Sequence, residues 1–564
     1  MRIGFIKVFF LLLFLGILTR FFYWQILKAD ELKAKAEGQH FENLQTPAIR
    51  GEIHFNDGFI LASSRPTFLL FATPKILSEI EKKDLATILA KFLADNKEEE
   101  KAFKEEFSNK LSQNLFWVQL QKSLSLETKR ELERLKLKGI DFQETSNRFY
   151  PEGSSSAQLL GFVGSNQRGE DTGYFGLEGF YNGELKGISG NIRQEKDALG
   201  LPILFGTLLG KPAKNGQNIE TNIDRTIQFI VEQTLQKDME KYGAKAASAL
   251  VMDPKTGAIL AMASFPNYDP AKFSKFPKEY YRNPLVADSY EPGSTFKVLV
   301  MASAINEDLI KPDTKCDQCS GPLTLGGFNI RTWNNEYRKD ITMTETIVHS
   351  NNIGMVFVGK KLGLDKMYSY LENFGMGNIT GIDLQDEGVV DLRQKKDWKE
   401  IDLATASFGQ GVLVTPIQMI RAVAAIANGG KLVQPQVVRR IEGNKSFGIK
   451  PRIIREVIKE DTAKIITEMM VKAVDEGEAK YAKPKGFKIA GKTGTAQIPI
   501  AGHYDPNKTI ASFVGFAPAD NPKFIMLVRF DQPSSSVFGA ETAAPTFFSI
   551  AKQLFTYYKI APTE

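Results

Sequence analysis

The chain is poor in the residues that most often bind metals. Among its 564 residues it has only two cysteines and four histidines. Cys316 and Cys319 are close together, but the histidines are scattered, so a four-ligand zinc site is disfavoured. We expect no metal and no cofactor. The two cysteines are expected to form a local disulfide or to remain free thiols in a loop.

The chain also lacks any basic run interleaved with aromatic residues. Its net charge is +6, from 72 basic and 66 acidic residues, and that small excess does not favour binding to nucleic acid. An anionic surface such as a membrane or a cell wall is compatible with this charge. The composition is ordinary for a globular protein, with 43% hydrophobic residues. The length exceeds what one core supports, so we expect two or more domains.

Only one apolar run is long enough to cross a bilayer. It extends from Val8 to Leu27, and its only charge is Arg20. Arg2 and Lys7 precede it, which predicts a cytoplasmic N-terminus and places the remaining chain outside the cytoplasm. A cleaved signal peptide is the alternative, but no small-residue cleavage site follows the run. We therefore expect a retained single-pass membrane anchor.

After the anchor, the sequence contains two regions that differ in their residue patterns. Residues 28–215 contain amphipathic helical patterns from Ile76 to Leu137 and a glycine-rich stretch after them. By itself, this region does not indicate a catalytic or binding function. Residues 216–564 begin with a strand and an Asp224-capped helix, continue with a hairpin, and end with two strands and a helix. We expect an α+β fold, with an antiparallel sheet covered by helices, on an elongated α+β pedestal.

One candidate nucleophile stands at a predicted helix start. Pro292 and Gly293 end the preceding segment, and an apolar helical run follows Phe296. Ser294 and Lys297 therefore lie three positions apart on one helix face. A desolvated lysine can act as the base that turns a serine into a nucleophile. This spacing alone is a weak signal, because Ser549 and Lys552 repeat it on the C-terminal helix.

The order of three motifs carries more weight than any one of them. S-x-x-K at Ser294 is followed by S-x-N at Ser350 and by K-T-G-T at Lys492. A second K-T-G at Lys255 precedes Ser294 and is expected to be a hairpin turn, and nothing follows Ser549. This ordered trio is typical of penicillin-binding proteins and class A β-lactamases.

The chain resembles a class B penicillin-binding protein over nearly its whole length, most closely the septal, cell-division type. Beyond the trio, the resemblance is carried by RGEI at Arg50, RFYPEG at Arg148, GLEGFYNGEL at Gly176, VMDPKTGAILAMAS at Val251, YEPGSTFK at Tyr290, FGQGVLVTP at Phe408 and AGKTGTAQ at Ala490. The resemblance implies a penicillin-binding transpeptidase domain over residues 216–564. It also implies a non-catalytic, dimerisation-like pedestal over residues 28–215, after an anchor over residues 1–27.

The resemblance further implies a role for each motif residue. Ser294 would be the acylated nucleophile, Lys297 its general base, and Ser350 and Lys492 a proton relay to the leaving amine. Asn352 would hydrogen-bond both Lys297 and the amide carbonyl of the substrate, and so hold them in position. Thr493 and Thr495 would bind the substrate carboxylate, Gly494 would let the substrate lie along the strand, and the backbone N–H groups of Ser294 and Thr495 would form an oxyanion hole.

The implied reaction is D,D-transpeptidation of peptidoglycan stem peptides, with an acceptor amine as the second substrate and β-lactams as covalent inhibitors. The implied partners are a membrane glycan polymerase and division-complex proteins. An elongation-type transpeptidase, a D,D-carboxypeptidase or β-lactamase, and a non-catalytic β-lactam sensor remain alternatives. His349, Glu291, Trp333 and Tyr337 lie near the motifs, and we interpret them as structural. Asn351, where the family pattern often has serine, is expected to matter little.

Overall fold

The computed structural model describes residues 2–167, 169–195, 209–443, 446–500 and 503–563. The chain forms two compact units. The first comprises residues 1–50, 66–146 and 186–216, and the second comprises residues 51–65, 147–185 and 217–564. The last junction lies next to the boundary expected at 215/216. The second unit also takes in two earlier segments from the region expected to form the pedestal.

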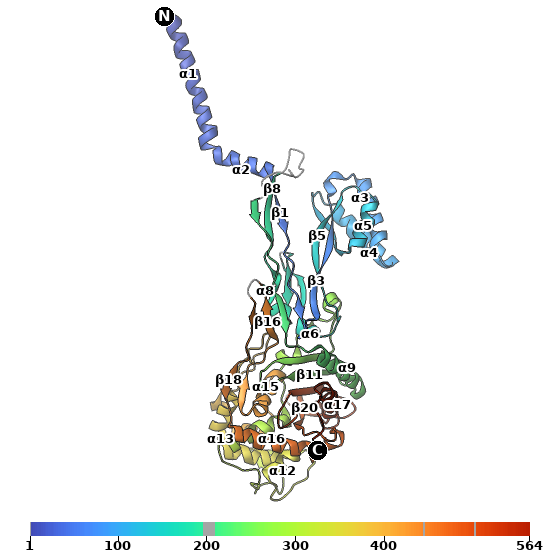
Figure 1. Cartoon of the computed structure of the whole chain (residues 1–564), viewed down its shortest axis with the longest axis vertical. Helices are drawn as coiled ribbons and strands as arrows, with labels where there is room; N and C mark the ends of the chain where they lie inside the picture. The colour runs from blue at the N-terminus through green and yellow to red at the C-terminus, as the bar shows by residue number, and fades with distance from the viewer. Residues whose placement is uncertain (1, 168, 196–208, 444–445, 501–502, 564) are drawn as a thin grey trace. The chain divides into compact units, whose positions relative to one another are not determined.

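The first unit holds the N-terminal helix and a small group of helices on strands (Figure 1). Its elements are α1 (Arg2–Phe22), α2 (Ala29–His40), β1 (Phe41–Thr46), α3 (Glu79–Leu93), α4 (Lys97–Leu111), β4 (Val118–Leu124), α5 (Leu126–Arg134), β8 (Gly190–Glu195) and β9 (Leu209–Lys211). Strands β3 (Ile60–Ala72) and β5 (Ile140–Phe149) each have residues in both units.

The helices expected between Ile76 and Leu137 are α3, α4 and α5. Each begins at a side-chain cap: Ser78 forms a capping box at α3, Asn96 accepts hydrogen bonds from two N–H groups of α4, and Ser125 accepts one from Thr128 N at α5. Strand β4 lies between α4 and α5 and was not expected. Its buried Val118 and Leu120 alternate with polar neighbours, a strand pattern too short to stand out between helices.

The N-terminal apolar run forms the expected helix. Residues Ile3–Leu27 make a helical stretch of 25 residues with mean hydropathy 2.2, and none of its apolar window is buried in the protein. This length is sufficient to span a bilayer. The Arg20 guanidinium lies 5.3 Å from the Trp24 ring centroid. The single charged residue of the apolar run therefore contacts one of its aromatic residues. The helix fits a single-pass anchor for a large soluble part.

The second unit contains the remaining elements. They are β2 (Ile53–His54), α6 (Ala157–Leu160), β6 (Phe162–Ser165), β7 (Asp171–Tyr174), α7 (Gly176–Phe180), α8 (Asn182–Lys186), β10 (Asn218–Thr221), α9 (Arg225–Tyr242), β11 (Ala246–Met252), β12 (Ile259–Phe265), α10 (Pro284–Ala287), α11 (Lys297–Asn306), β13 (Leu323–Leu325), β14 (Phe328–Ile330), α12 (Met343–Val348), α13 (Asn352–Asn373), α14 (Glu400–Ala406), α15 (Pro416–Ala427), β15 (Lys431–Val433), β16 (Val438–Glu442), β17 (Phe447–Gly448), β18 (Ile453–Glu456), α16 (Glu460–Asp475), β19 (Ala490–Ile500), β20 (His503–Ala517), β21 (Phe524–Asp531) and α17 (Ala543–Tyr557).

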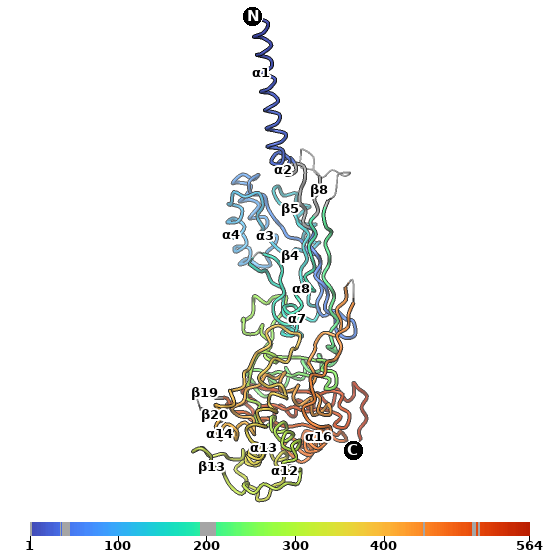
Figure 2. Tube along the Cα trace, turned by 90° about the vertical axis from the view of Figure 1, so that its left-hand side faces the viewer, coloured from blue at the N-terminus to red at the C-terminus, as the bar shows by residue number. Residues whose placement is uncertain are grey.

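A five-stranded antiparallel sheet organises this unit, with strand order β12-β11-β21-β20-β19. Successive side chains of β11 point to opposite faces. Ala249 and Val251 belong to the hydrophobic cluster that includes α9 and α17, whereas Leu250 and Met252 belong to the cluster that includes α11 and α15. Figure 1 shows α9 and α17 together beside the sheet, and Figure 2 shows α12, α13 and α16 gathered at the lower end of this unit. The expected α+β class is confirmed.

A short corner separates helix α12 from helix α13. Helix α12 ends at Val348, and α13 begins at Asn352. Between them Ser350 has a φ of 52°, a left-handed conformation that stops the first helix. Asn351 then caps α13, because its Oδ1 accepts a hydrogen bond of 2.8 Å from Gly354 N. Ser350 therefore lies at a corner between two helices.

The two cysteines form a disulfide between Cys316 and Cys319. Both are buried and belong to the larger hydrophobic cluster of the second unit. The bond closes a short loop between α11 and β13. This was one of the two states expected from the sequence.

Candidate active site

The serine of the first motif lies in a tight turn before α11. Ser294 belongs to a 3-10 turn over Gly293–Phe296, and Lys297 is the first residue of α11. Gly293 has a φ of 55°, and its N–H donates to Gly409 O at 3.0 Å. Ser294 is half-buried, and its hydroxyl makes no hydrogen bond within the described part of the chain. The hydroxyl is thus positioned by its backbone and not tied to another group.

Lys297 is fully buried and makes three close polar contacts. Its Nζ lies 2.6 Å from Ser350 O, 3.2 Å from Ser350 Oγ and 2.8 Å from Asn352 Oδ1. Burial, and secondly the charge of Lys492, lower the pKa of Lys297 well below 10.5. A lysine whose neutral form is favoured in this way can accept a proton. The structure therefore brings the S-x-x-K and S-x-N motifs together.

Asn352 uses both ends of its side-chain amide. Its Oδ1 contacts Lys297, and its Nδ2 donates to Arg331 O at 2.9 Å. Since an amide nitrogen carries two protons, one donor is left for another group. The first donor holds the loop that follows β14, a contact that the motif pattern does not predict.

The K-T-G-T residues lie on β19, the edge strand of the sheet. Lys492 is buried, and its Nζ lies 3.1 Å from Thr493 Oγ1. Burial lowers the pKa of Lys492 to about 8. Thr495 Oγ1 accepts a hydrogen bond of 3.0 Å from Gly539 N, so its own hydroxyl proton remains available for a ligand.

The edge of β19 packs directly on the turn that carries Ser294. A Cβ on Gly494 would lie 2.5 Å from Ser512 Oγ and 2.8 Å from Thr295 Cγ2. A Cβ on Gly293 would lie 3.1 Å from Thr495 O. These distances leave no room for side chains at either glycine. The backbone of Ser294 and the backbone of Thr495 are thereby brought side by side.

One acidic residue near the two lysines was missed by the sequence analysis. Glu478 follows α16, and its carboxyl lies near the side chain of Trp333. Its side chain reaches solvent, yet neighbouring protein atoms desolvate the carboxyl enough to raise its pKa, against the opposing charges of Lys492 and Lys297. No local pattern marks this residue, because its partners are distant in sequence.

Trp333 and Phe538 stand beside this cluster. Their ring centroids are 5.6 Å apart in an edge-to-face arrangement, and Trp333 is 47% exposed. Phe538 directly precedes Gly539, which contacts Thr495. Trp333 is thus packed against another ring, as expected, but it also contacts the acidic residue of the cluster.

The other residues near the motifs have structural contacts. His349 Nε2 lies 2.6 Å from Arg338, and burial lowers its pKa. Tyr337 packs against the larger hydrophobic cluster. The duplicate motifs also lie where expected. Ser549 and Lys552 are exposed on α17, and the Lys255 motif forms the turn between β11 and β12.

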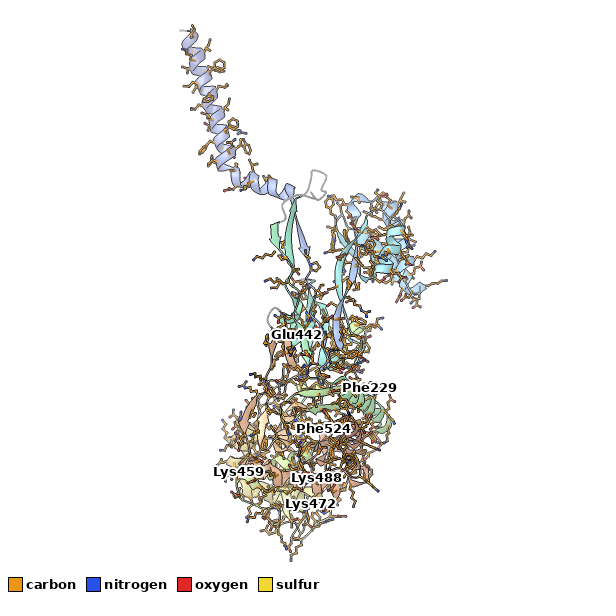
Figure 3. The ribbon with its side chains drawn as sticks, viewed as in Figure 1. Phe229, Glu442, Lys459, Lys472, Lys488 and Phe524 are labelled. Carbon is orange, nitrogen blue, oxygen red and sulfur yellow. A yellow bond between two sulfur atoms is a disulfide. The ribbon has the colours of Figure 1, made fainter. Side chains whose placement is uncertain are left out.

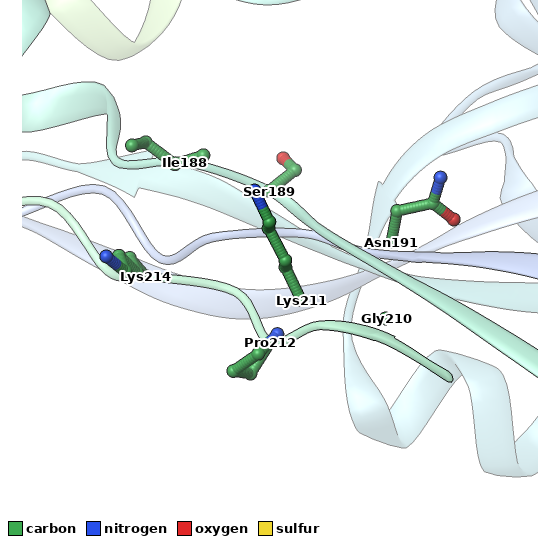
Figure 4. A pocket seen from close by; sticks show the side chains of 7 residues that line it. All are labelled: Ile188, Ser189, Asn191, Gly210, Lys211, Pro212 and Lys214. Carbon is green, nitrogen blue, oxygen red and sulfur yellow. The ribbon is translucent and has the colours of Figure 1, made fainter. Parts of the chain in front are cut away.

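Two further cavities contain none of the predicted site residues. The first, of about 590 Å³, belongs to the first unit and lies along β8 and β9, with Ser189, Asn191 and Lys211 in its lining (Figure 4). The second, of about 480 Å³, belongs to the second unit and lies beside α9.

Comparison with known proteins identifies the family. A model of the penicillin-binding protein transpeptidase domain matches residues 247–554, which include all three motifs. A model of the penicillin-binding protein dimerisation domain matches residues 45–221. The chain belongs to the penicillin-binding protein family.

Curated relatives of this penicillin-binding protein match over almost its full length. Stage V sporulation protein D of Bacillus subtilis is 35% identical over 100% of this chain and 86% of its own. The peptidoglycan D,D-transpeptidase FtsI of Buchnera aphidicola is 30% identical over 98% of this chain and 94% of its own. The probable peptidoglycan D,D-transpeptidase PenA of Neisseria meningitidis is 30% identical over 100% and 94%.

Solved structures agree with this membership. Penicillin binding protein 2X from Streptococcus thermophilus has a TM-score of 0.74 at 25% identity, covering 92% of this chain and 80% of its own. Penicillin binding protein 3 from Mycobacterium tuberculosis, solved in complex with aztreonam, has a TM-score of 0.70 at 25% identity, covering 92% and 98%. The fold of a penicillin-binding transpeptidase with its dimerisation domain is therefore shown.

Proposed function

We propose that this penicillin-binding protein is a D,D-transpeptidase in which Ser294 is the acylated nucleophile. The observation that carries the proposal is the buried Lys297, with its lowered pKa, one turn after a serine whose hydroxyl is unengaged. A neutral lysine in a dry site can take the serine proton as general base. The substrate is a stem peptide that ends in two D-alanines.

The first step forms one bond and breaks another. Ser294 Oγ bonds to the carbonyl carbon between the two D-alanines, and its proton passes to Lys297. Ser350 Oγ, 3.2 Å from Lys297 Nζ, relays that proton toward the leaving amine, with Lys492 completing the relay. The C–N bond then breaks, the terminal D-alanine leaves, and an ester on Ser294 remains.

The developing negative charge falls between two backbone donors. The N–H groups of Ser294 and Thr495 form the oxyanion hole, a role supported by the close packing of Gly293 on Thr495. Removing one such donor typically costs about a hundredfold to a thousandfold in rate. Because both donors are backbone groups, the packing of the two glycines controls them.

The substrate binds along the outer edge of β19. Its terminal carboxylate takes the hydroxyl protons of Thr493 and Thr495 and the charge of Lys492. Its peptide backbone adds as a strand beside Gly494. Asn352 donates its remaining amide proton to the substrate carbonyl. In the second step, an amine from a neighbouring stem peptide attacks the ester and makes the crosslink.

Labelling with penicillin tests the nucleophile. The full chain in detergent is reacted with a labelled penicillin, and the adduct is mapped by peptide mass spectrometry. We expect a long-lived adduct on Ser294 that is absent in Ser294→Ala and present in Ser549→Ala, the matched change in the duplicate motif. An adduct elsewhere, or none, would refute the assignment.

The lifetime of the adduct separates the alternatives. Loss of label within seconds favours a β-lactamase, whereas a stable adduct with hydrolysis of a pentapeptide to the tetrapeptide acid, and no crosslinked product when an acceptor amine is supplied, favours a carboxypeptidase. A sensor would hold the label and crosslink nothing. The full-length match to D,D-transpeptidases supports the crosslinking enzyme.

We propose that the protein is anchored in the bacterial cytoplasmic membrane, with residues 28–564 on its outer face. In this arrangement residues 28–215 are a non-catalytic pedestal, and a membrane glycan polymerase and division proteins are the partners. The name FtsI of one relative supports a septal role, and the name of the sporulation relative supports a second candidate, a role in sporulation. Septal localisation, with filaments on depletion, supports the division role; round cells support elongation instead.

A further inference from the structure

The cavity beside α9 is a polar pocket on the side of the sheet remote from Ser294. It is lined by the first turns of α9, by the turn after Pro151 and by the end of β12. Strand β12 is one edge of the five-stranded sheet, and β19, which packs on the Ser294 turn, is the other. Four strand spacings separate the edges by about 19 Å. A ligand in this cavity would not occupy the acylation site.

The charged groups of the cavity already have partners within it. Arg225 donates to Glu152 Oε1 at 2.8 Å. Glu232 Oε1 accepts hydrogen bonds from Ser156 N at 2.7 Å and from Gln228 Nε2 at 2.8 Å. Arg225 and Glu152 neutralise each other, and Glu232, whose hydrogen-bond donors are neutral, leaves the lining with at most one negative charge. It suits a ligand without strong net charge.

Several planar polar groups still have hydrogen-bonding capacity. Asn267 donates through Nδ2 to Ser154 O at 3.2 Å, which leaves its Oδ1 available. The exposed amides of Gln233 and Gln236 make no hydrogen bond to any described residue. Each amide offers both donors and an acceptor. Such groups match the hydroxyls of a sugar.

Aromatic rings complete the cavity. Phe229 lines it and is 64% exposed, at the surface of α9 (Figure 3). Buried Phe55 and Phe265 add an apolar part to the lining. Together the three rings give the polar pocket an apolar wall. A pocket of this size suits a ligand of one or two sugar rings.

We propose that this cavity binds a neutral N-acetylated saccharide. The C–H face of one sugar ring stacks on Phe229, the hydroxyls bond to Gln233, Gln236 and Asn267, and the acetyl methyl group contacts Phe55 or Phe265. Resting on the proposed function, we identify the source as the glycan strand that carries the stem peptides. The site would hold that strand while Ser294, at the other edge of the sheet, reacts with a peptide.

Binding of chitotetraose, a soluble oligomer of N-acetylglucosamine, tests the proposal. Saturation-transfer NMR and calorimetry are recorded with the full chain in detergent. We expect saturable binding that Phe229→Ala weakens by about tenfold or more, because the stacking surface is removed. Phe447→Ala, which removes a similarly exposed ring (53%) on β17, should leave binding unchanged. Glycan strands stripped of their peptides by an amidase should compete.

Labelling with penicillin, run on every variant, separates this proposal from the assignment of Ser294. Normal labelling with no saturable chitotetraose binding, or with equal binding by Phe229→Ala, overturns the saccharide site alone. Loss of binding after acylation would place the sugar in the active site and also overturn it. Failure of stripped strands to compete would overturn the peptidoglycan source. If Phe229→Ala fails to fold, the double variant Gln233→Ala/Gln236→Ala decides by the same criterion.

Discussion

Lys297 and Lys492 are both withdrawn from water, yet burial affects them to different degrees. The pKa of Lys492 falls to about 8, with the charge of Glu478 opposing the fall. The pKa of Lys297 is lowered well below its usual value, because the charge of Lys492 adds to the effect of burial. Lys492, with a pKa of about 8, is therefore largely protonated at neutral pH, whereas the environment of Lys297 favours its neutral form. The first can attract a carboxylate while the second accepts a proton.

This difference predicts a bell-shaped dependence of acylation on pH. The rate should rise with pH as Lys297 loses its proton, because only the neutral amine acts as base. It should fall again above about 8, as Lys492 loses the charge that attracts the substrate carboxylate. The second-order rate constant for acylation by penicillin, measured across the pH range, checks both limbs. Lys492→Arg should move the alkaline limb to higher pH. A limb that stays at the same pH would exclude Lys492 as its cause.

Glu478 should shift both limbs together. Its charge raises the pKa values of Lys297 and Lys492, so Glu478→Gln should lower both and displace the whole profile to lower pH. The matched control is Glu476→Gln, which removes a carboxylate two residues away whose charge does not act on the pKa of either lysine. The same acylation assay provides the profiles. Profiles that coincide for Glu478→Gln and the unaltered chain would rule out this influence.

At the scale of elements, the site depends on one close contact, that between β19 and the Ser294 turn. Gly494→Ala would push a methyl group into Ser512 Oγ and Thr295 Cγ2. We expect a loss of about 1–3 kcal/mol in stability, as in other overpacked positions, and a strong loss of acylation. Thermal unfolding and penicillin labelling measure the two effects.

Gly448→Ala is the matched control for that change. Gly448 also lies in a strand, but the nearest atom to its added Cβ is 3.8 Å away. It should retain both stability and labelling. If Gly494→Ala behaved in the same way, the contact between strand and turn would not position Ser294.

Local patterns in the sequence predicted much of this arrangement. Local sequence is enough to predict three features: the order of Ser294, Ser350 and Lys492, the cap at Asp224, and the hairpin of β11 and β12. Each depends on residues that are neighbours in the chain. The break at Ser350 depends instead on a left-handed φ that tertiary packing imposes on a residue with no preference for it. Glu478 was missed because its partners Trp333 and Lys492 belong to other segments.

For the whole molecule, the division into units depends on pairing between distant strands. Strand β2 pairs with β10 through Ile53 and Ile219, so a short early segment belongs with the C-terminal unit. No pattern around Ile53 predicts this partner. The boundary predicted at 215/216 lies next to a junction between the units, but nothing local in the sequence predicted the return of residues 51–65 and 147–185 to the second unit.

The N-terminal anchor helix belongs to the first unit, whereas every proposed site residue belongs to the second. None of the apolar window of Ile3–Leu27 is buried in the protein, so its removal takes away no packing. A chain lacking residues 2–27 should stay in solution without detergent and should be acylated by penicillin within about twofold of the full-length rate, as expected for independent parts. Sedimentation and the acylation assay measure the two properties. A soluble chain with greatly slowed acylation would show that the helix supports the site, and a chain that still sediments with membranes would reveal a second attachment.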